Sequence, residues 1–296
     1  HEENRVNIVA LDYLEFENSF ENLQWISENS DSNRNPSCSF IRYSNSSAQV
    51  VWEMKRNDNW DLVISEYSDS GWSLPRTLID TEKDEVNACF ATDSENRFSS
   101  NSIVYESNGS IYYLPNVDSS FSTELVFETS DTTKYSSPAA FIYVDLYVFT
   151  VCKKSDTLYT LNYKKKNLTT DHWEEEIILV ESIFIKRPKA TDYEYSFSSS
   201  LAFEMEVSGR SSVFLYRDLN SLFQNNYERL VSNENIKTSY FTAHSIYIVT
   251  EKDDLFVGAA SNYKYIKNDS AFVRIPINYW GSYNDILLNY NDGKLI

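Results

Sequence analysis

A short polar motif recurs about every fifty residues along this chain, and its period constrains the fold more than any other feature of the sequence. The motif occurs as Asn35-Pro36-Ser37-Cys38, Val86-Asn87-Ala88-Cys89, Ser137-Pro138-Ala139-Ala140 and Arg187-Pro188-Lys189-Ala190. The second residues of these occurrences are 51, 51 and 50 positions apart. Such a period is typical of arrays in which one supersecondary unit is repeated, so we expect a repeat architecture.

The repeat over residues 36–85 has the pattern of four short antiparallel strands. Runs of apolar and polar residues at 36–42, 48–55, 60–67 and 72–79 are separated by turns rich in Asn, Asp, Ser and Gly. The chain contains 22 Tyr and 17 Phe, which suit pleated, half-buried surfaces better than helices. Because it contains only 6 Gly and 6 Pro, its turns depend on Asn, Asp and Ser, whose side chains satisfy nearby backbone groups.

The same course of strands continues along the chain and predicts an all-β, six-bladed β-propeller that forms a single domain over residues 1–296. Each blade has four antiparallel strands. The approximate blades are 36–85, 86–135, 136–186, 187–236, 237–268, and 269–296 combined with 1–35. Pairing of the N-terminal strands with the C-terminal strands would close the ring and remove exposed sheet edges. Five blades is the alternative, if the residues after about 270 pack outside the ring.

The repeat resembles a known family of propeller repeats. The segments VVWE (50–53), NWDLVISEY (59–67) and GWSLPRTLI (71–79), followed by Asn87, look like the WD40-like, TolB-type repeat of bacterial secreted and periplasmic proteins. This resemblance implies a secreted, periplasmic or cell-surface location. It leaves the activity open, because propellers serve as enzymes, lectins and scaffolds alike.

Charge and composition exclude several classes of partner. The net charge of −18 argues against a nucleic-acid or anionic-membrane partner, since a phosphate surface needs a basic face. No run of 18 apolar residues exists, so we expect no membrane insertion. The histidines and cysteines lack the spacing of metal ligands or of a catalytic triad, and we expect no metal and no cofactor. These residues are His1, His172, His244, Cys38, Cys89 and Cys152.

Glutamates recur after an aromatic residue in the second strand of several repeats, as Trp52-Glu53, Tyr105-Glu106 and Phe203-Glu204. Paired carboxylates drive glycoside hydrolysis, but a catalytic acid is needed only once. A residue that recurs at one strand position indicates a structural role. We therefore expect these glutamates to satisfy turn amides or to contact a neighbouring blade.

Three arginines and two aromatic residues are the candidate ligand-binding set. Arg34, Arg187 and Arg274 lie at or near the start of an innermost strand, where the loops converge on one mouth of the channel. Guanidinium groups bind carboxylates bidentately, so these arginines could hold an acidic ligand. The alternative is that each arginine pairs with a local Asp or Glu. Trp60 and Tyr135 could stack on a sugar or a peptide.

Two short elements resemble sialidases, which are six-bladed propellers. Phe272-Val273-Arg274-Ile275-Pro276 is similar to their Arg-Ile-Pro element, and Ser68-Asp69-Ser70-Gly71-Trp72 is similar to one Asp-box turn. The resemblance implies a carboxylate-binding arginine cluster. It does not assign a Tyr nucleophile or its Glu partner in this chain.

We therefore expect a non-catalytic binding or scaffolding propeller that recognises a protein or glycan ligand at one mouth of its channel, with no catalytic residues assigned. The alternative is a sialidase-like or other glycosidase with an arginine-lined carboxylate site. A third hypothesis is a spacer within a larger surface protein, which an exposed apolar docking patch would support. The identity of the ligand and the oligomeric state stay open.

Overall fold

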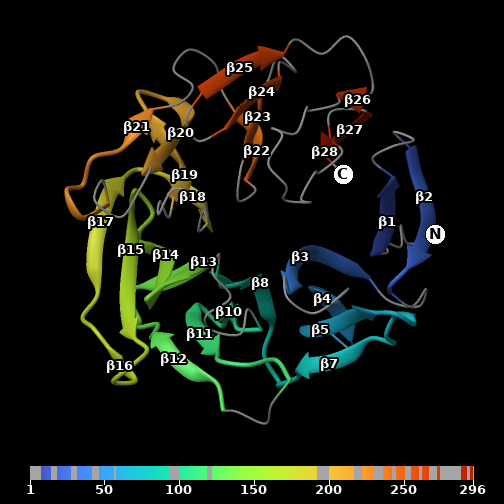
Figure 1. Cartoon of the computed structure of the whole chain (residues 1–296). Helices are drawn as coiled ribbons and strands as arrows, with labels where there is room; N and C mark the ends of the chain where they lie inside the picture. The colour runs from blue at the N-terminus through green and yellow to red at the C-terminus, as the bar shows by residue number, and fades with distance from the viewer. Residues whose placement is uncertain are drawn as a thin grey trace.

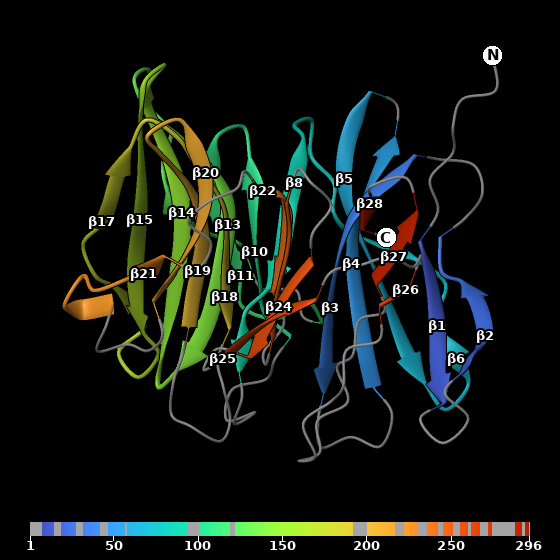
Figure 2. The same ribbon diagram turned by 90° about the horizontal axis from the view of Figure 1, so that it is seen from above.

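The computed structural model describes residues 8–14, 19–27, 32–41, 47–56, 58–93, 101–118, 122–191, 200–216, 222–229, 236–241, 245–250, 255–259, 262–266, 272–273, 288–291 and 294–295. These residues are mostly β-strands in antiparallel sheets, several of them four-stranded, which confirms the predicted all-β class. The sheets lie side by side around a ring, as Figure 1 shows face-on and Figure 2 from the side. The arrangement is propeller-like.

Five sheets each follow one stretch of the chain, except that the third also includes Thr92–Asp93, a short strand that comes before most of the second sheet and pairs in parallel with the third. The first contains β3 (Asn33–Ile41), β4 (Ser47–Arg56), β5 (Asn59–Ser68), β6 (Gly71–Trp72) and β7 (Arg76–Ile79). The second contains β8 (Glu85–Phe90), β10 (Ile103–Ser107), β11 (Ser110–Leu114) and β12 (Glu124–Phe127). The third contains β9 (Thr92–Asp93), β13 (Lys134–Tyr143), β14 (Asp145–Ser155), β15 (Leu158–Asn167), β16 (His172–Trp173) and β17 (Ile177–Ser182).

The remaining strands complete the ring. The fourth sheet contains β18 (Ile185–Thr191), β19 (Ser200–Val207), β20 (Arg210–Tyr216) and β21 (Glu228–Arg229). The fifth contains β22 (Ile236–Phe241), β23 (Ser245–Thr250), β24 (Leu255–Ala259) and β25 (Asn262–Ile266). Smaller groups near the two ends of the chain are β1 (Val9–Leu14) with β2 (Ser19–Trp25), and β26 (Phe272–Val273) with β27 (Leu288–Asn291) and β28 (Lys294–Leu295).

Apart from the two-residue β9, which pairs in parallel with β13, each of the five sheets begins with its innermost strand, which faces the middle of the ring (Figure 1). We call the end at which β3, β8, β13 and β18 begin the near end, and the opposite end the far end. Because successive strands are antiparallel, the β4–β5, β10–β11 and β14–β15 hairpins also lie at the near end. None of the described residues forms a helix long and apolar enough to cross a membrane.

Apolar side chains fill the spaces between neighbouring sheets. The aromatic residue before each repeated glutamate is almost completely buried: Trp52, Tyr105 and Phe203 are at most 4% exposed. Each lies in a cluster that joins its own sheet to a neighbour. Fully burying one large apolar side chain stabilises a fold by about 1.5–3 kcal/mol. These aromatic residues are therefore core residues, and their recurrence reflects packing.

The repeated polar motif is a β-bulge in each innermost strand. The register shifts in the same place in four sheets, and the first bulged residue has a positive φ in three of them: Asn35 (51°), Asn87 (54°) and Ser137 (53°). Asn tolerates this left-handed conformation better than most residues, which explains its use here. The motif alignment made from the sequence is wrong by one residue in the second repeat, because Asn35 corresponds to Asn87 and Pro36 does not.

The repeated glutamates join one sheet to the next through these bulges. Glu53 Oε1 accepts a hydrogen bond from the backbone N–H of Asn87 at 2.7 Å, and Glu106 Oε2 accepts one from the backbone N–H of Ser137 at 3.2 Å. The Asn87 side chain also donates to Glu106 at 2.8 Å. The prediction that these glutamates meet turn amides or a neighbouring blade is thus confirmed for Glu53 and Glu106, whereas Glu204 pairs with Lys186 of its own sheet. We call this chain of contacts the carboxylate latch.

Replacing the buried Glu53 with Ala should lower the free energy of unfolding by about 3 kcal/mol, because part-buried donors of Arg34, Asn35 and Asn87 would lose their acceptor. Glu53→Gln should cost less, since it keeps one acceptor oxygen. Glu181→Ala, at an exposed position in β17, is the control and should change the free energy of unfolding by less than about 0.5 kcal/mol. Urea unfolding measures all three, and equal values for Glu53→Ala and Glu181→Ala would contradict the latch.

Candidate functional site

Arg34 and Trp60, two of the predicted ligand-binding residues, lie together at the near end. The guanidinium carbon of Arg34 is 3.7 Å from the centre of the Trp60 indole ring. Arg34 lies at the start of β3 and Trp60 at the start of β5, with β4 between these strands. A guanidinium at this distance over an aromatic face is held by a cation–π attraction of about 0.5–1 kcal/mol at an exposed site.

Glu53 fixes the orientation of Arg34. Its Oε2 accepts a hydrogen bond from Arg34 Nε at 2.5 Å, and its Oε1 accepts one from the side-chain amide of Asn35 at 2.9 Å. The Glu53 side chain is fully buried, whereas that of Arg34 is 44% exposed. Among the described residues, the two Nη groups of Arg34 have no hydrogen-bond partner. The site is therefore an arginine side chain whose Nε is held by Glu53 and whose two Nη groups are accessible.

The other predicted arginines do not join this site in the described part of the chain. Arg274 lies outside the described residues, and for Arg187 only the backbone, at the bulge of β18, is described. The register shows that Arg34 corresponds to Lys186, which pairs with Glu204 at 3.3 Å as Arg34 pairs with Glu53. For Arg34, pairing with a local acid is thus the observed arrangement.

Tyr135 lies in the core between two sheets. It is 7% exposed, its ring lies 5.1 Å from that of Phe127, and its hydroxyl donates to Glu176 at 3.0 Å. Burial is the main cause that raises the pKa of Tyr135 well above its usual range, and the nearby Glu176 carboxylate raises it further. The residue does not share a surface with Trp60, and its position makes it a packing residue.

An acidic loop supports the near end beside Trp60. The backbone N–H of Trp60 donates to Asp84 at 2.9 Å, and the Asn59 side chain donates to the carbonyl of Thr81 at 2.8 Å. These bonds attach the β4–β5 hairpin to the loop that leads into the next sheet. Glu85 at the end of this loop is buried and accepts a hydrogen bond from the Thr81 hydroxyl.

Three buried carboxyl groups near this end have raised pKa values. Burial is the main cause for Asp61, Glu85 and Glu106. The Asp80 carboxylate adds to the effect at Asp61, and hydrogen bonds from Thr81 oppose it at Glu85. One oxygen of Asp61, Oδ1, is buried without a hydrogen-bond partner in the described part of the chain. These groups are therefore less costly to bury when protonated.

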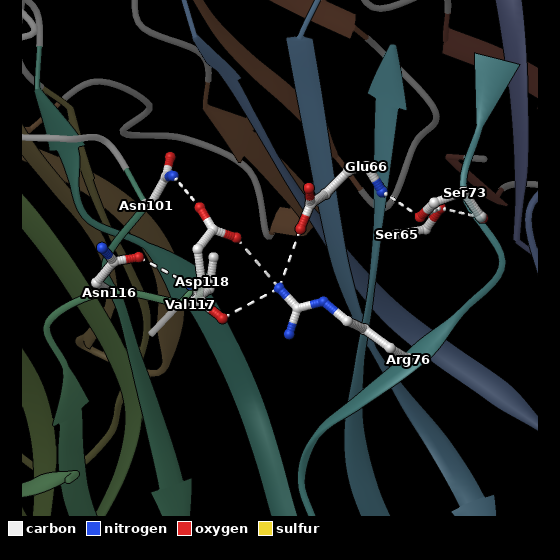
Figure 3. Close-up of polar contacts among 8 residues, drawn as sticks. All are labelled: Ser65, Glu66, Ser73, Arg76, Asn101, Asn116, Val117 and Asp118. Atoms are coloured by element: carbon white, nitrogen blue, oxygen red, sulfur yellow. Dashed lines mark hydrogen bonds and ion pairs between the residues drawn. The ribbon is translucent and has the colours of Figure 1, made fainter. Parts of the chain in front are cut away.

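Arg76, which is not among the predicted site residues, joins two sheets at the far end (Figure 3). Its Nη2 donates to Glu66 at 3.0 Å within its own sheet, and to the Val117 carbonyl at 3.0 Å and Asp118 at 3.2 Å in the next sheet. The side-chain amide of Asn101 donates a hydrogen bond to the other oxygen of Asp118 at 2.6 Å. The residue lies in an outer strand, and its partners Val117 and Asp118 belong to the next sheet, so these contacts could be found only from the fold.

Comparisons with known proteins support the fold alone. No protein-family model matches the chain, and no curated protein matches it in sequence. A protein of unknown function from Dyadobacter fermentans has a similar structure, with a TM-score of 0.54, 6% identity, and coverage of 86% of this chain and 80% of that one. A Synechocystis apocarotenoid oxygenase variant has a TM-score of 0.52 and 8% identity, and the match covers 82% of this chain but only 64% of the oxygenase.

A cobalt-substituted form of that oxygenase has a TM-score of 0.52 with 8% identity, covering 88% of this chain and 72% of the oxygenase. The described residues of this chain do not fit a bound metal of that kind. His172 is exposed on β16, and no group of three His, Cys, Asp or Glu side chains in the described ranges could hold a metal ion. His1 and His244 lie outside those ranges.

Stability should increase on mild acidification. A carboxyl group whose pKa is raised in the folded state binds its proton more tightly there, so its stabilising contribution is present at low pH and is lost as the pH rises through the folded-state pKa. Asp61, Glu85 and Glu106 all have this sign. We expect the melting temperature to fall as the pH rises from about 4, the ordinary carboxyl pKa, through the raised pKa values of these groups, measured by calorimetry.

Asp61→Asn should flatten this pH dependence. The control is Asp156→Asn, because the hydrogen bond from Lys153 lowers the pKa of the exposed Asp156, which gives the opposite sign. A pH profile that Asp61→Asn leaves unchanged would mean that Asp61 does not contribute.

Proposed function

We propose that this chain is a non-catalytic ligand-binding propeller that recognises a protein or a glycan at the near end of its ring. The observation that carries the proposal is the Arg34 guanidinium, stacked 3.7 Å above Trp60 and anchored by the buried Glu53. An arginine in this setting loses little rotational freedom when it binds, and loss of that freedom is a major cost of binding. Its free Nη edge suits a carboxylate or carbonyl oxygen of the ligand.

The carboxylates around the site support binding rather than catalysis. Glu53 and Glu106 accept hydrogen bonds from the bulges of the innermost strands, and Glu85 holds the loop of Thr81. A general acid or base must be free to exchange a proton with a substrate. Carboxylates committed to the fold in this way are poor candidates for that role.

We also propose that the ring has six blades. The five sheets from β3 to β25 follow the predicted four-strand course, and the β26–β28 and β1–β2 groups lie next to each other in both views (Figures 1 and 2). Their combination into a sixth blade would close the ring. Five blades, with the C-terminal strands outside the ring, is the alternative. The WD40-like, TolB-type resemblance supports a secreted, periplasmic or cell-surface location.

The second candidate function is a sialidase-like or other glycosidase. The turn over Ser68–Trp72 favours it, because it joins β5 to β6 at the edge of a sheet with Gly71 at a φ of 95°. Of the three arginines expected in such a site, Arg34 is described and is held by Glu53. A glycosidase would need a further arginine and a nucleophile beside Arg34.

A ligand panel tests the proposal. Neutral, uronic-acid and sialylated oligosaccharides and short acidic peptides would be screened by thermal shift, where a ligand at a hundred times its Kd adds about 2.7 kcal/mol of stability. For any ligand found, Trp60→Ala and Arg34→Lys should each raise the Kd by at least about tenfold by calorimetry. Release of a sugar product would support the glycosidase.

Arg76→Lys is the matched control, because Arg76 and Arg34 have equal side-chain exposure of 44% and both form ion pairs, but at opposite ends. It should leave the Kd unchanged. A ligand whose affinity is insensitive to both near-end variants would bind elsewhere and would contradict the proposal.

A further inference from the structure

Large exposed apolar side chains are distributed unevenly between the two ends of the ring. Most of those in the described residues lie at the far end or in the half of an outer strand that begins there, and two lie at the near end. The far-end residues are Leu74, Leu125, Val144, Ile177, Ile178 and Phe223, and the near-end residues are Leu158 and Ile183. The proposed ligand site is at the near end, so the far-end side chains have no role in it.

Two of these side chains continue the core between the third and fourth sheets. The Phe223 ring lies 6.5 Å from the ring of Tyr147, which lies 6.3 Å from the ring of Tyr163. Tyr163 is the cross-strand partner of Ile177, so these two side chains share one face of the sheet. The buried cluster therefore reaches the surface at Ile177 and Phe223, which are 44% and 57% exposed.

Val144 has an unfavourable conformation, and the Asp145–Lys165–Glu174 ion pairs connect its hairpin to the segment before Ile177. It occupies the tip of the β13–β14 hairpin with a φ of 62° and is exposed. A β-branched residue in the left-handed region costs about 1–3 kcal/mol, and Gly or Asn would avoid that cost. The fold alone does not require valine there, because its side chain projects into solvent. Backbone strain that exposes an apolar side chain indicates a role outside the fold.

Acidic residues lie close to Val144 and Ile177 along the chain. Lys165 is bound by Asp145 at 3.0 Å and by Glu174 at 3.1 Å, which links the Val144 hairpin to the segment before Ile177. One cation between two carboxylates leaves a net negative charge. Glu175 adds a further exposed carboxylate, and the whole chain carries a net charge of −18. A partner for this surface must therefore be positively charged.

We propose that Val144, Ile177 and Phe223, which we call the far-end patch, dock a basic segment of a partner protein. The segment packs apolar side chains against the three residues and places Lys or Arg beside Glu174 and Glu175. Apolar anchors supply most of the affinity at such a surface, and the charges supply orientation and rate of association. This site is separate from the Arg34–Trp60 site and does not depend on it.

The test uses fluorescence anisotropy with the full chain and a short labelled peptide of alternating Leu and Lys. We expect saturable binding that weakens as salt is added. Phe223→Ser and Ile177→Ser should each raise the Kd at least about tenfold, as expected for anchor residues. Ile183→Ser is the matched control, because Ile183 is 56% exposed at the near end, and it should leave the Kd unchanged.

Val144→Gly separates binding from folding. It removes the strain, so the melting temperature should stay the same or rise, while peptide affinity should fall. Three results would overturn the proposal. The first is unchanged affinity in all three patch variants, and the second is equal binding of a peptide with Ser in place of Leu. The third is a dimer of the chain in size-exclusion chromatography that Phe223→Ser dissociates, because the occupant would then be a second copy.

Discussion

The carboxylate latch fixes how the first three sheets meet at the middle of the ring, because it joins their innermost strands by hydrogen bonds, whereas Arg76 links the first two sheets only at the far end. Arg34, Glu53, Asn87, Glu106 and Ser137 form one hydrogen-bonded chain across three sheets. A buried carboxylate is costly unless several donors surround it, so each glutamate specifies the position of the next bulge. Apolar contacts supply more of the stability, but they allow the sheets to slide. The latch restricts that movement.

The same latch builds the candidate site. Glu53 holds the bulge of the neighbouring sheet with one oxygen and the Arg34 side chain with the other. Anything that bound Arg34 strongly enough to displace it from Glu53 would therefore disturb the junction between two sheets. This coupling favours ligands that use the free Nη edge and leave the Nε–Glu53 bond intact. Because of this coupling, Arg34→Lys tests ligand binding with less disturbance of the junction than removal of the whole side chain would cause.

The period of the chain was sufficient to predict the all-β class and strands such as β4 and β19, because strand alternation and Asx-rich turns are local signals. It also indicated a structural role for Glu53 and Glu106. The one-residue error at Asn87 arose because a bulge shifts the register without changing composition. Tyr135 could not be separated from Trp60 by sequence, since both precede apolar runs and only packing decides which is covered. The ion pairs of Arg76 span two sheets and leave no periodic trace.

The junction between the third and fourth sheets lacks the glutamate of the carboxylate latch, and this absence accounts for the far-end patch. In the third sheet Val151 occupies the position of Glu53 and Glu106, opposite Ser136 at the bulge. No carboxylate is available there to reach the fourth sheet, and apolar packing must replace it. The cluster at this junction accordingly includes Val151, Tyr147 and Phe203. A junction held mainly by apolar area gains stability by extending that area, and here it extends to the surface at Phe223. The patch is thus the exposed edge of the junction that lacks the latch.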